Sequence, residues 1–180
     1  VVQQDNYRGG FLAAHYLLHA GCRALAWIGP IGKFSPTRER YAGAVAALAE
    51  AGLPPPLIVG AAVPHAQLRE CLDTLLSDPH RPDGLLAFTL AGAKAVGSIA
   101  KERGLDLERR TRMVGWVVEE CFQQEYAPLF AGRKPPPAVV WSAQACATTA
   151  LDRLERLGKG QTSMTLRVHL PVRIEGAKAS

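Results

Sequence analysis

Residues 29–37, GPIGKFSPT, contain the glycines and the lysine that phosphate-binding loops use. A nucleoside-triphosphate loop needs the pattern GxxxxGK followed by Ser or Thr, because that hydroxyl must reach the magnesium ion. Here Gly32 and Lys33 are followed by Phe34, and the preceding glycine, Gly29, is three residues back instead of five. The spacing therefore argues against a phosphate loop.

Arg40 follows this segment and is the next candidate for chemistry. It lies in the first turns of a predicted helix that comes directly after a predicted strand, so its side chain can point into a cleft. The guanidinium group presents fixed donors that suit carboxylates and sugar hydroxyls. From position alone, a solvated helix arginine is the competing interpretation.

Patterns for catalysis are absent from the sequence. Neither GxGxxG with a following acid nor the nucleophile motif GxSxG occurs. His65 and the adjacent Glu119 and Glu120 are the nearest acid–base candidates, and we interpret them as a helix start and a solvated loop. The four cysteines and five histidines are dispersed, so no close pair predicts a zinc or redox site. We expect no enzyme activity, no metal and no cofactor, and cysteines kept reduced in the cytoplasm.

Short apolar runs alternate with helical periods along the chain. The pattern predicts strands at 24–29, 57–61, 85–89, 112–116, 138–142 and 164–175. It predicts helices at 6–21, 35–52, 65–78, 91–104 and 143–160, with 117–137 irregular around one helical turn. Asp5 and Ser35 are expected to cap the first two helices. The alternation predicts an α/β fold, a doubly wound and mostly parallel sheet with helices on both faces, whose ligands bind at the carboxyl ends of the strands.

Composition fits one globular domain. The chain has 180 residues, of which 48% are hydrophobic, and a formal net charge of +5. The basic residues are scattered, so we interpret them as solvated surface and not as a nucleic-acid interface. No apolar run approaches the ~20 residues of a membrane span. The start, VVQQDNYRGG, shows neither a signal peptide nor an initiating Met, which predicts a processed form or a fragment.

Six segments, in order along the chain, closely resemble the lactose-repressor (LacI/GalR) family of bacterial transcription regulators. They are DNYRGGFLAAHYLLHAGCRALAWIGP, SPTRERYAGAVAALAEAGL, RPDGLLAF, AKAVGSIAKERGL, MVGW and VHLPVRIEG. The resemblance covers essentially the whole chain and implies a partial periplasmic-binding-protein-like type I core with two α/β lobes. It implies that residues 24–136 and 164–180 form the carboxyl lobe, and that 1–23 and 137–163 are pieces of the amino lobe.

The resemblance also implies a function. A small-molecule effector, sugar-like or anionic, would bind in the cleft between the lobes and alter DNA affinity. Operator DNA would be bound only through an amino-terminal helix-turn-helix that these residues lack, the protein would work as a homodimer, and no membrane would be involved. Arg40 matches the arginine that grips the effector in the family, and Asp5 matches an acid that often lines the cleft.

Several positions depart from the family pattern. Ala91 and Gly92 stand where an Asn-Asp pair is common, Val117 replaces an acid, and Ala62 replaces a stacking aromatic residue. A sugar needs several converging polar groups, because each buried hydroxyl left unpaired costs ~1–3 kcal/mol. We therefore expect a less hydroxylated or anionic ligand, or a pocket that has lost tight binding.

The candidate ligand-binding residues share a place at or near the ends of predicted strands: Arg40, Asp5, Ser35, Ala62, Ala91, Trp116 and Val117. Two other function classes stay open. A transport solute-binding protein shares the implied fold, and its gene would encode an export signal in place of the helix-turn-helix. A small α/β enzyme would need an acid, base or nucleophile arranged in the strand-end loops.

Overall fold

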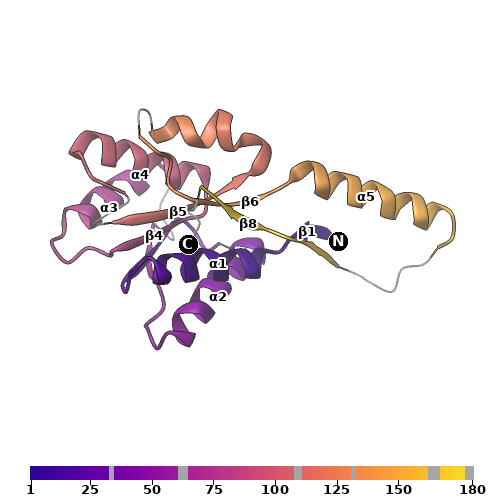
Figure 1. Cartoon of the computed structure of the whole chain (residues 1–180), viewed down its shortest axis with the longest axis horizontal. Coiled ribbons are helices and arrows are strands. Elements are labelled where there is room, and N and C mark those ends of the chain that lie inside the picture. Colours follow the sequence, from indigo (N-terminus) through magenta and orange to yellow (C-terminus); the bar gives the residue numbers. More distant parts are fainter. Residues whose placement is uncertain (33–34, 61–64, 108–110, 131–132, 162–166, 177–180) are drawn as a thin grey trace.

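The computed structural model of the chain contains a six-stranded sheet with helices on both faces (Figure 1). It describes residues 1–32, 35–60, 65–107, 111–130, 133–161 and 167–176. The strands of this sheet are β2 (Leu25–Ile28), β3 (Leu57–Val59), β4 (Gly84–Ala87), β5 (Arg112–Val118), β6 (Ala138–Trp141) and β8 (Arg173–Glu175). They lie in the order β3-β2-β4-β5-β6-β8, and all neighbours are parallel except the antiparallel pair β6 and β8. The predicted α/β fold class is confirmed.

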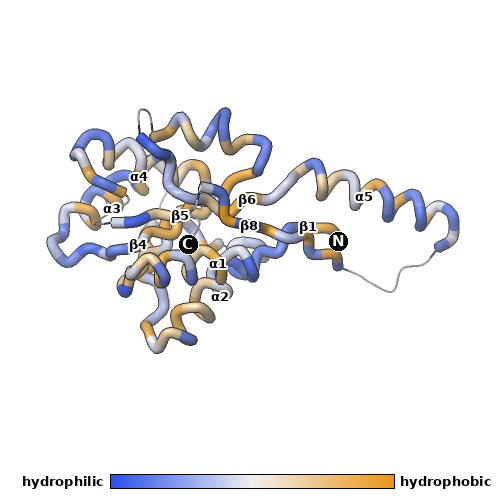
Figure 2. The backbone as a smooth tube through the Cα atoms, in the orientation of Figure 1, coloured by the Kyte–Doolittle hydropathy of each residue, from blue (hydrophilic) through white to orange (hydrophobic). Residues whose placement is uncertain are grey.

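Helices α1 (Asn6–His19) and α2 (Ser35–Glu50) cover one face of the sheet. The other face carries α3 (His65–Ser77), α4 (Leu90–Arg103) and three short helical segments, η1 (Glu119–Cys121), η2 (Phe122–Tyr126) and η3 (Ala127–Phe130). A parallel sheet covered on both faces requires strands that are apolar throughout. Every residue of β2 and β4 is buried, and hydrophobic residues run along the central strands in Figure 2.

Successive buried residues of β2, β4 and β6, and most of those of β5, alternate between two buried clusters. Trp27, Phe88 and Trp116 pack with α1 and α2, whereas Val117 packs in the cluster of the α3 and α4 face. Arg40 belongs to α2, so only strand residues on the face covered by α1 and α2 can lie near it.

Helices α1 and α2 cross at close range because each has a glycine that faces the backbone of the other helix. A Cβ added at Gly10 would lie 1.8 Å from the carbonyl oxygen of Arg40, and one at Gly43 would lie 2.0 Å from that of Tyr7. Gly9 likewise admits the Trp116 ring, whose nearest carbon would be 2.4 Å from an added Cβ. Three small residues thus bring α1, α2 and β5 together around Arg40.

A second part of the structure extends from one side of the sheet (Figure 1). Here β1 (Val2–Gln4) pairs in parallel with β7 (Val168–Leu170), and α5 (Ala143–Gly158) projects beside them. No residue of α5 is buried, although the helix is amphipathic. Its leucines Leu151, Leu154 and Leu157 are 66%, 64% and 52% exposed.

The predicted division into lobes differs from these contacts. The family resemblance implies that residues 1–23 and 137–163 belong to the amino lobe, yet α1 packs on the six-stranded sheet and β6 lies inside it. Residues 164–175, predicted as one strand, contain β7 in the small sheet and β8 in the large one, separated by Pro171. Proline has no N–H for a strand ladder, so a switch of sheets at this point is physically reasonable. The pattern of hydrophobic residues indicates which segments are buried, but it does not indicate which sheet a strand joins.

Two other expectations were incomplete. Strand β1 was not predicted, and the segment expected to be irregular holds η1, η2 and η3 as nearly continuous helical turns. Within the described residues, no helix is long and apolar enough to cross a lipid bilayer.

Candidate functional site

Arg40 lies in the second turn of α2 and points across the carboxyl end of the sheet. Its Nε donates a 2.9 Å hydrogen bond to Oδ1 of Asn6, the first residue of α1. Its Nη1 donates to the carbonyl oxygen of Phe88, 3.3 Å away, directly after β4. The guanidinium group therefore ties the start of α1 and the end of β4 to α2.

The indole ring of Trp116 in β5 packs against the same guanidinium group. The Arg40 Cζ atom lies 3.8 Å from the Trp116 ring centroid, well inside the range of a cation–π contact. Burial lowers the pKa of Arg40 to about 10, and the nearby Glu39 carboxylate acts in the opposite direction. Arg40 therefore keeps its positive charge at neutral pH in a partly desolvated position, where a bound anion would interact more strongly than at an open surface.

Further polar side chains lie around Asn6 and Glu39, next to the Arg40 guanidinium group. Asn6 is fully buried, and its amide nitrogen approaches Oε2 of Glu39 at 3.5 Å. The other donors to Glu39 are the Ser35 hydroxyl at 2.7 Å and the Gln3 amide at 3.3 Å. Since Gln3 belongs to β1, the small sheet borders the cluster, which thus lies between the two parts of the structure.

The structure brings some predicted site residues together and leaves others apart. Asp5 accepts a 2.9 Å hydrogen bond from the Arg8 N–H and caps α1, beside Asn6. Ser35 opens α2 and bonds to Glu39, while Ala91 lies partly buried in the first turn of α4. These positions line the carboxyl edge of the sheet, as expected for a binding site in this fold class.

Val117 and Ala62 do not join this arrangement. The Val117 side chain is buried in the core of the α3 and α4 face, on the opposite side of the sheet from Trp116. Ala62 lies outside the described residues. Neither residue contributes a described contact to the Arg40 cluster.

Sequence reasoning missed Asn6, Glu39 and Gln3. The available signals were weak: Asn6 follows a capping aspartate, and Glu39 adjoins Arg40. Their convergence depends on the close approach of α1 and α2, which a pattern of hydrophobic residues does not show.

Two cavities of about 440 and 220 Å³ lie elsewhere, and Arg40 does not line either of them. Among the described residues, no group of three or more His, Cys, Asp or Glu side chains is placed to hold a metal ion. The Arg40 cluster offers binding groups, namely one cation, two amides and a carboxylate that accepts the Ser35 hydroxyl.

No protein-family model and no curated sequence matches the chain. Solved structures do match. A regulatory protein of the LacI family from Chloroflexus aggregans has a TM-score of 0.80 at 19% identity, over 96% of this chain and 60% of that one. A LacI family transcriptional regulator from Enterococcus faecium with bound ribose has a TM-score of 0.77 at 20% identity, over 97% and 62%. A periplasmic binding protein/LacI transcriptional regulator from Alkaliphilus metalliredigens, complexed with D-xylulofuranose, has a TM-score of 0.73 at 20% identity, over 97% and 63%.

The chain has the fold of LacI-family regulators. It spans between 52% and 63% of the length of eight of the structures that it resembles, at identities of 12–24%. The likeness therefore covers the architecture of this chain and does not by itself carry a ligand from those proteins to this one.

In this LacI-type fold, two acids hold the segments that link the six-stranded sheet to α5 and the small sheet. Glu119 forms a two-pronged ion pair with Arg173 of β8, at 2.8 and 2.7 Å, and this pairing lowers its pKa. Glu120 accepts from the Ser142 hydroxyl at 2.8 Å and from the Gln144 N–H at 3.2 Å, at the start of α5. Hydrogen bonds from its own backbone, from Ser142 and from Gln144 lower the pKa of Glu120 to about 2. Both acids are open to solvent, as interpreted from the sequence, but they also have specific partners at the connecting segments, which the sequence did not indicate.

Proposed function

We propose that the chain is the ligand-sensing part of a LacI-type transcriptional regulator. A small-molecule effector binds beside Arg40 and changes the DNA affinity of the full-length protein, whose DNA-binding region lies outside these 180 residues. The protein acts in the cytoplasm as a homodimer and does not transform its ligand. The observation that carries this proposal is the partly buried Arg40, held on Trp116 at the carboxyl edge of a LacI-type sheet.

The position of the cluster suggests how binding is transmitted. Gln3 of β1 contacts Glu39, so the cluster around Arg40 includes groups from both parts of the structure. A ligand that binds one relative arrangement of these parts more tightly shifts the population toward that arrangement. The segments held by Glu119 and Glu120 are the connections along which such a change would pass.

The surroundings of Arg40 favour an anionic or sparsely hydroxylated ligand. The guanidinium group itself covers a face of Trp116, so that face is closed to a sugar ring. Ala91 offers no polar side chain at the edge of the sheet, and Val117 is directed into the core. Arg40 is thus the main charged group available to a ligand, and carboxylates or phosphates fit its donors.

A thermal-shift comparison tests this proposal. We expect D-ribose 5-phosphate to raise the melting temperature more than D-ribose, D-glucose or cellobiose do at equal concentration, because only binding to the folded state stabilises it. Arg40→Gln should remove that stabilisation. Arg38→Gln is the matched control, since Arg38 is an exposed arginine of the same helix. Strong stabilisation by the uncharged sugars, or an unchanged response in Arg40→Gln, would contradict the proposal.

The alternative, a transport solute-binding protein, is not favoured by the comparisons, although the structure from Alkaliphilus metalliredigens carries both descriptions. The other two structures reported above are described only as regulators. The full-length gene separates the two functions, because a regulator encodes a helix-turn-helix and a transport protein encodes an export signal.

A further inference from the structure

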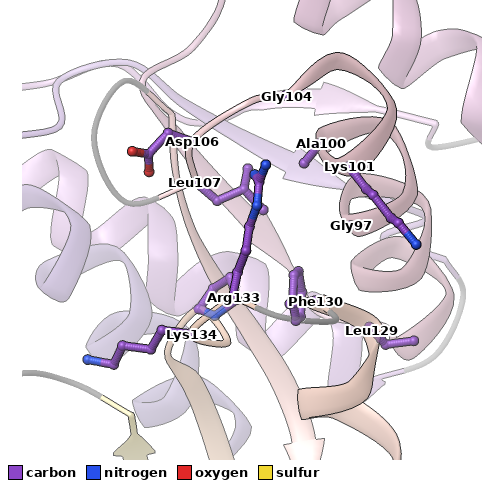
Figure 3. Close-up of a pocket in the computed structure, with 11 residues that line it drawn as sticks. Gly97, Ala100, Lys101, Gly104, Asp106, Leu107, Leu129, Phe130, Arg133 and Lys134 are labelled. Carbon is purple, nitrogen blue, oxygen red and sulfur yellow. The ribbon is translucent and has the colours of Figure 1, made fainter.

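Figure 3 shows the residues that line a cavity of about 440 Å³. Its lining residues place it at the opposite edge of the sheet from Arg40. Helix α4 begins at the carboxyl edge with Leu90, and the cavity is formed by its other end, from Gly97 to Gly104. The remaining walls come from Asp106 and Leu107, which precede β5, from Leu129 and Phe130 at the end of η3, and from residues within 133–136 before β6. The volume falls within the range of about 300–1,000 Å³ that is usual for small-molecule sites.

The interior of this cavity is apolar. The apolar residues that line it are Ala100, Leu107, Leu129, Phe130 and Pro136. Phe130 is only 7% exposed and extends into the cavity in Figure 3. A Cβ added at Gly97 would lie 3.2 Å from the Phe130 ring, so the glycine lets this ring pack tightly against α4. These surfaces would accept a flat apolar body.

The rim of the cavity is mainly cationic. Lys101, Arg133 and Lys134 line it, and Asp106 is the one carboxylate among its described lining residues. The Arg133 side chain runs across the cavity toward Leu107, whereas Lys101 and Lys134 extend outward on opposite sides (Figure 3).

Arg133 has unused donors. Its Nη1 donates a 2.7 Å hydrogen bond to the Leu105 carbonyl oxygen, which fixes the guanidinium group over the cavity. Within the described part of the chain, no acceptor is bonded to its Nε or Nη2. A guanidinium group anchored through one nitrogen can present the others to a carboxylate as paired donors.

We propose that this cavity is a second ligand site, separate from the Arg40 cluster, which takes a small aromatic anion. The aromatic body lies against Phe130, Leu107 and Pro136, and the carboxylate is bound by Arg133. This site does not depend on the function proposed for Arg40, because the two lie at opposite edges of the sheet and share no residue.

The test uses 2-naphthoate and its uncharged counterpart 2-naphthylmethanol, each titrated into the 180-residue chain and followed by amide NMR shifts. We expect 2-naphthoate to move the amide signals of Gly97, Gly104 and Leu107, and to bind about tenfold more tightly than the alcohol, as a charge-assisted hydrogen bond at a partly open site allows. The exposed leucines of α5 could also attract a naphthyl group, but that binding would move signals of α5 and would not distinguish the acid from the alcohol.

Arg133→Gln should weaken the binding of 2-naphthoate about tenfold and leave that of 2-naphthylmethanol unchanged, because it removes the guanidinium charge and donors but none of the apolar wall. Arg133→Lys should restore part of the affinity. The control is Lys94→Gln, because Lys94 is an exposed lysine of α4 that does not line the cavity. This substitution should change the affinity for neither compound. Arg133 is itself exposed, so the variants should fold. The proposal is overturned if the acid moves no signals around the cavity, if acid and alcohol bind equally, or if Arg133→Gln binds the acid as wild type does.

Discussion

Replacing Gly10 by alanine tests the close crossing of α1 and α2 on which the Arg40 cluster depends. The new Cβ would lie 1.8 Å from the Arg40 carbonyl oxygen, whereas an ordinary contact is 3.4 Å or more. The clash is with backbone, which no side-chain rotation relieves, so the helices must separate by more than an ångström. Overpacking of this kind costs about 1–3 kcal/mol and occasionally more.

The expected loss is at the upper end of that range. The gain in helix propensity from glycine to alanine, about 1 kcal/mol, offsets part of the clash. We expect a net loss of about 2–3 kcal/mol, which lowers the melting temperature of a chain of this size by about 5–10 °C. Because the displaced atom belongs to Arg40, ligand binding at the cluster should weaken as well.

Differential scanning calorimetry measures this change, with Gly158→Ala as the matched control. Gly158 is also helical, but nothing lies within 4 Å of an added Cβ. The control should melt at the wild-type temperature or slightly above, since alanine is the better helix former. Gly10→Ala melting at or above wild type would refute the close crossing of the two helices.

Three further substitutions have defined outcomes. Arg40→Ala leaves Oδ1 of the buried Asn6 and the Phe88 carbonyl without their donor, so urea denaturation should show a loss of about 1–3 kcal/mol; unchanged stability would mean that these bonds are not formed. Glu120→Gln should lower the melting temperature at neutral pH but not in strong acid. The folded pKa of Glu120, about 2, lies below its ordinary value of 4.5, so its stabilisation is present above pH 4.5 and is lost as the pH falls toward 2; melting curves in which wild type and variant differ equally at both ends of this window would contradict the assignment. Leu154→Gln on α5, where the leucine is 64% exposed, should reduce self-association in sedimentation velocity without lowering the melting temperature; a large loss of stability would show that this leucine is buried.

The regular elements of the main sheet could be predicted from the sequence because their residues carry local signals. Asp5 caps α1 as expected, and the apolar runs of β2 and β4 are fully buried strands. The partner of β7 could not be predicted, since a three-residue strand has too little pattern to specify which sheet it joins. Its pairing with β1 is set by tertiary structure.

The candidate site could be predicted in part, because one of its residues also has a local signal in the sequence. Arg40 could be selected because a strand followed by a helix places the start of that helix at the binding edge. Its bonds to Asn6 and its contact with Trp116 could not be predicted, because they depend on Gly9 and Gly10 admitting neighbouring groups. A glycine in a helical pattern does not indicate which neighbour will occupy the space.

The central claim is that Arg40 and its partners form the ligand-binding edge of this chain. Amide NMR mapping with D-ribose 5-phosphate tests it most directly. The account predicts that the amide signals of Asn6, of Arg40 and of Thr89, whose N–H shares a peptide bond with the Phe88 carbonyl, move together on titration. The signals of Asn6 and Thr89 should stay fixed in Arg40→Gln. Movement confined to residues away from this edge, or identical movement in Arg40→Gln, would contradict it.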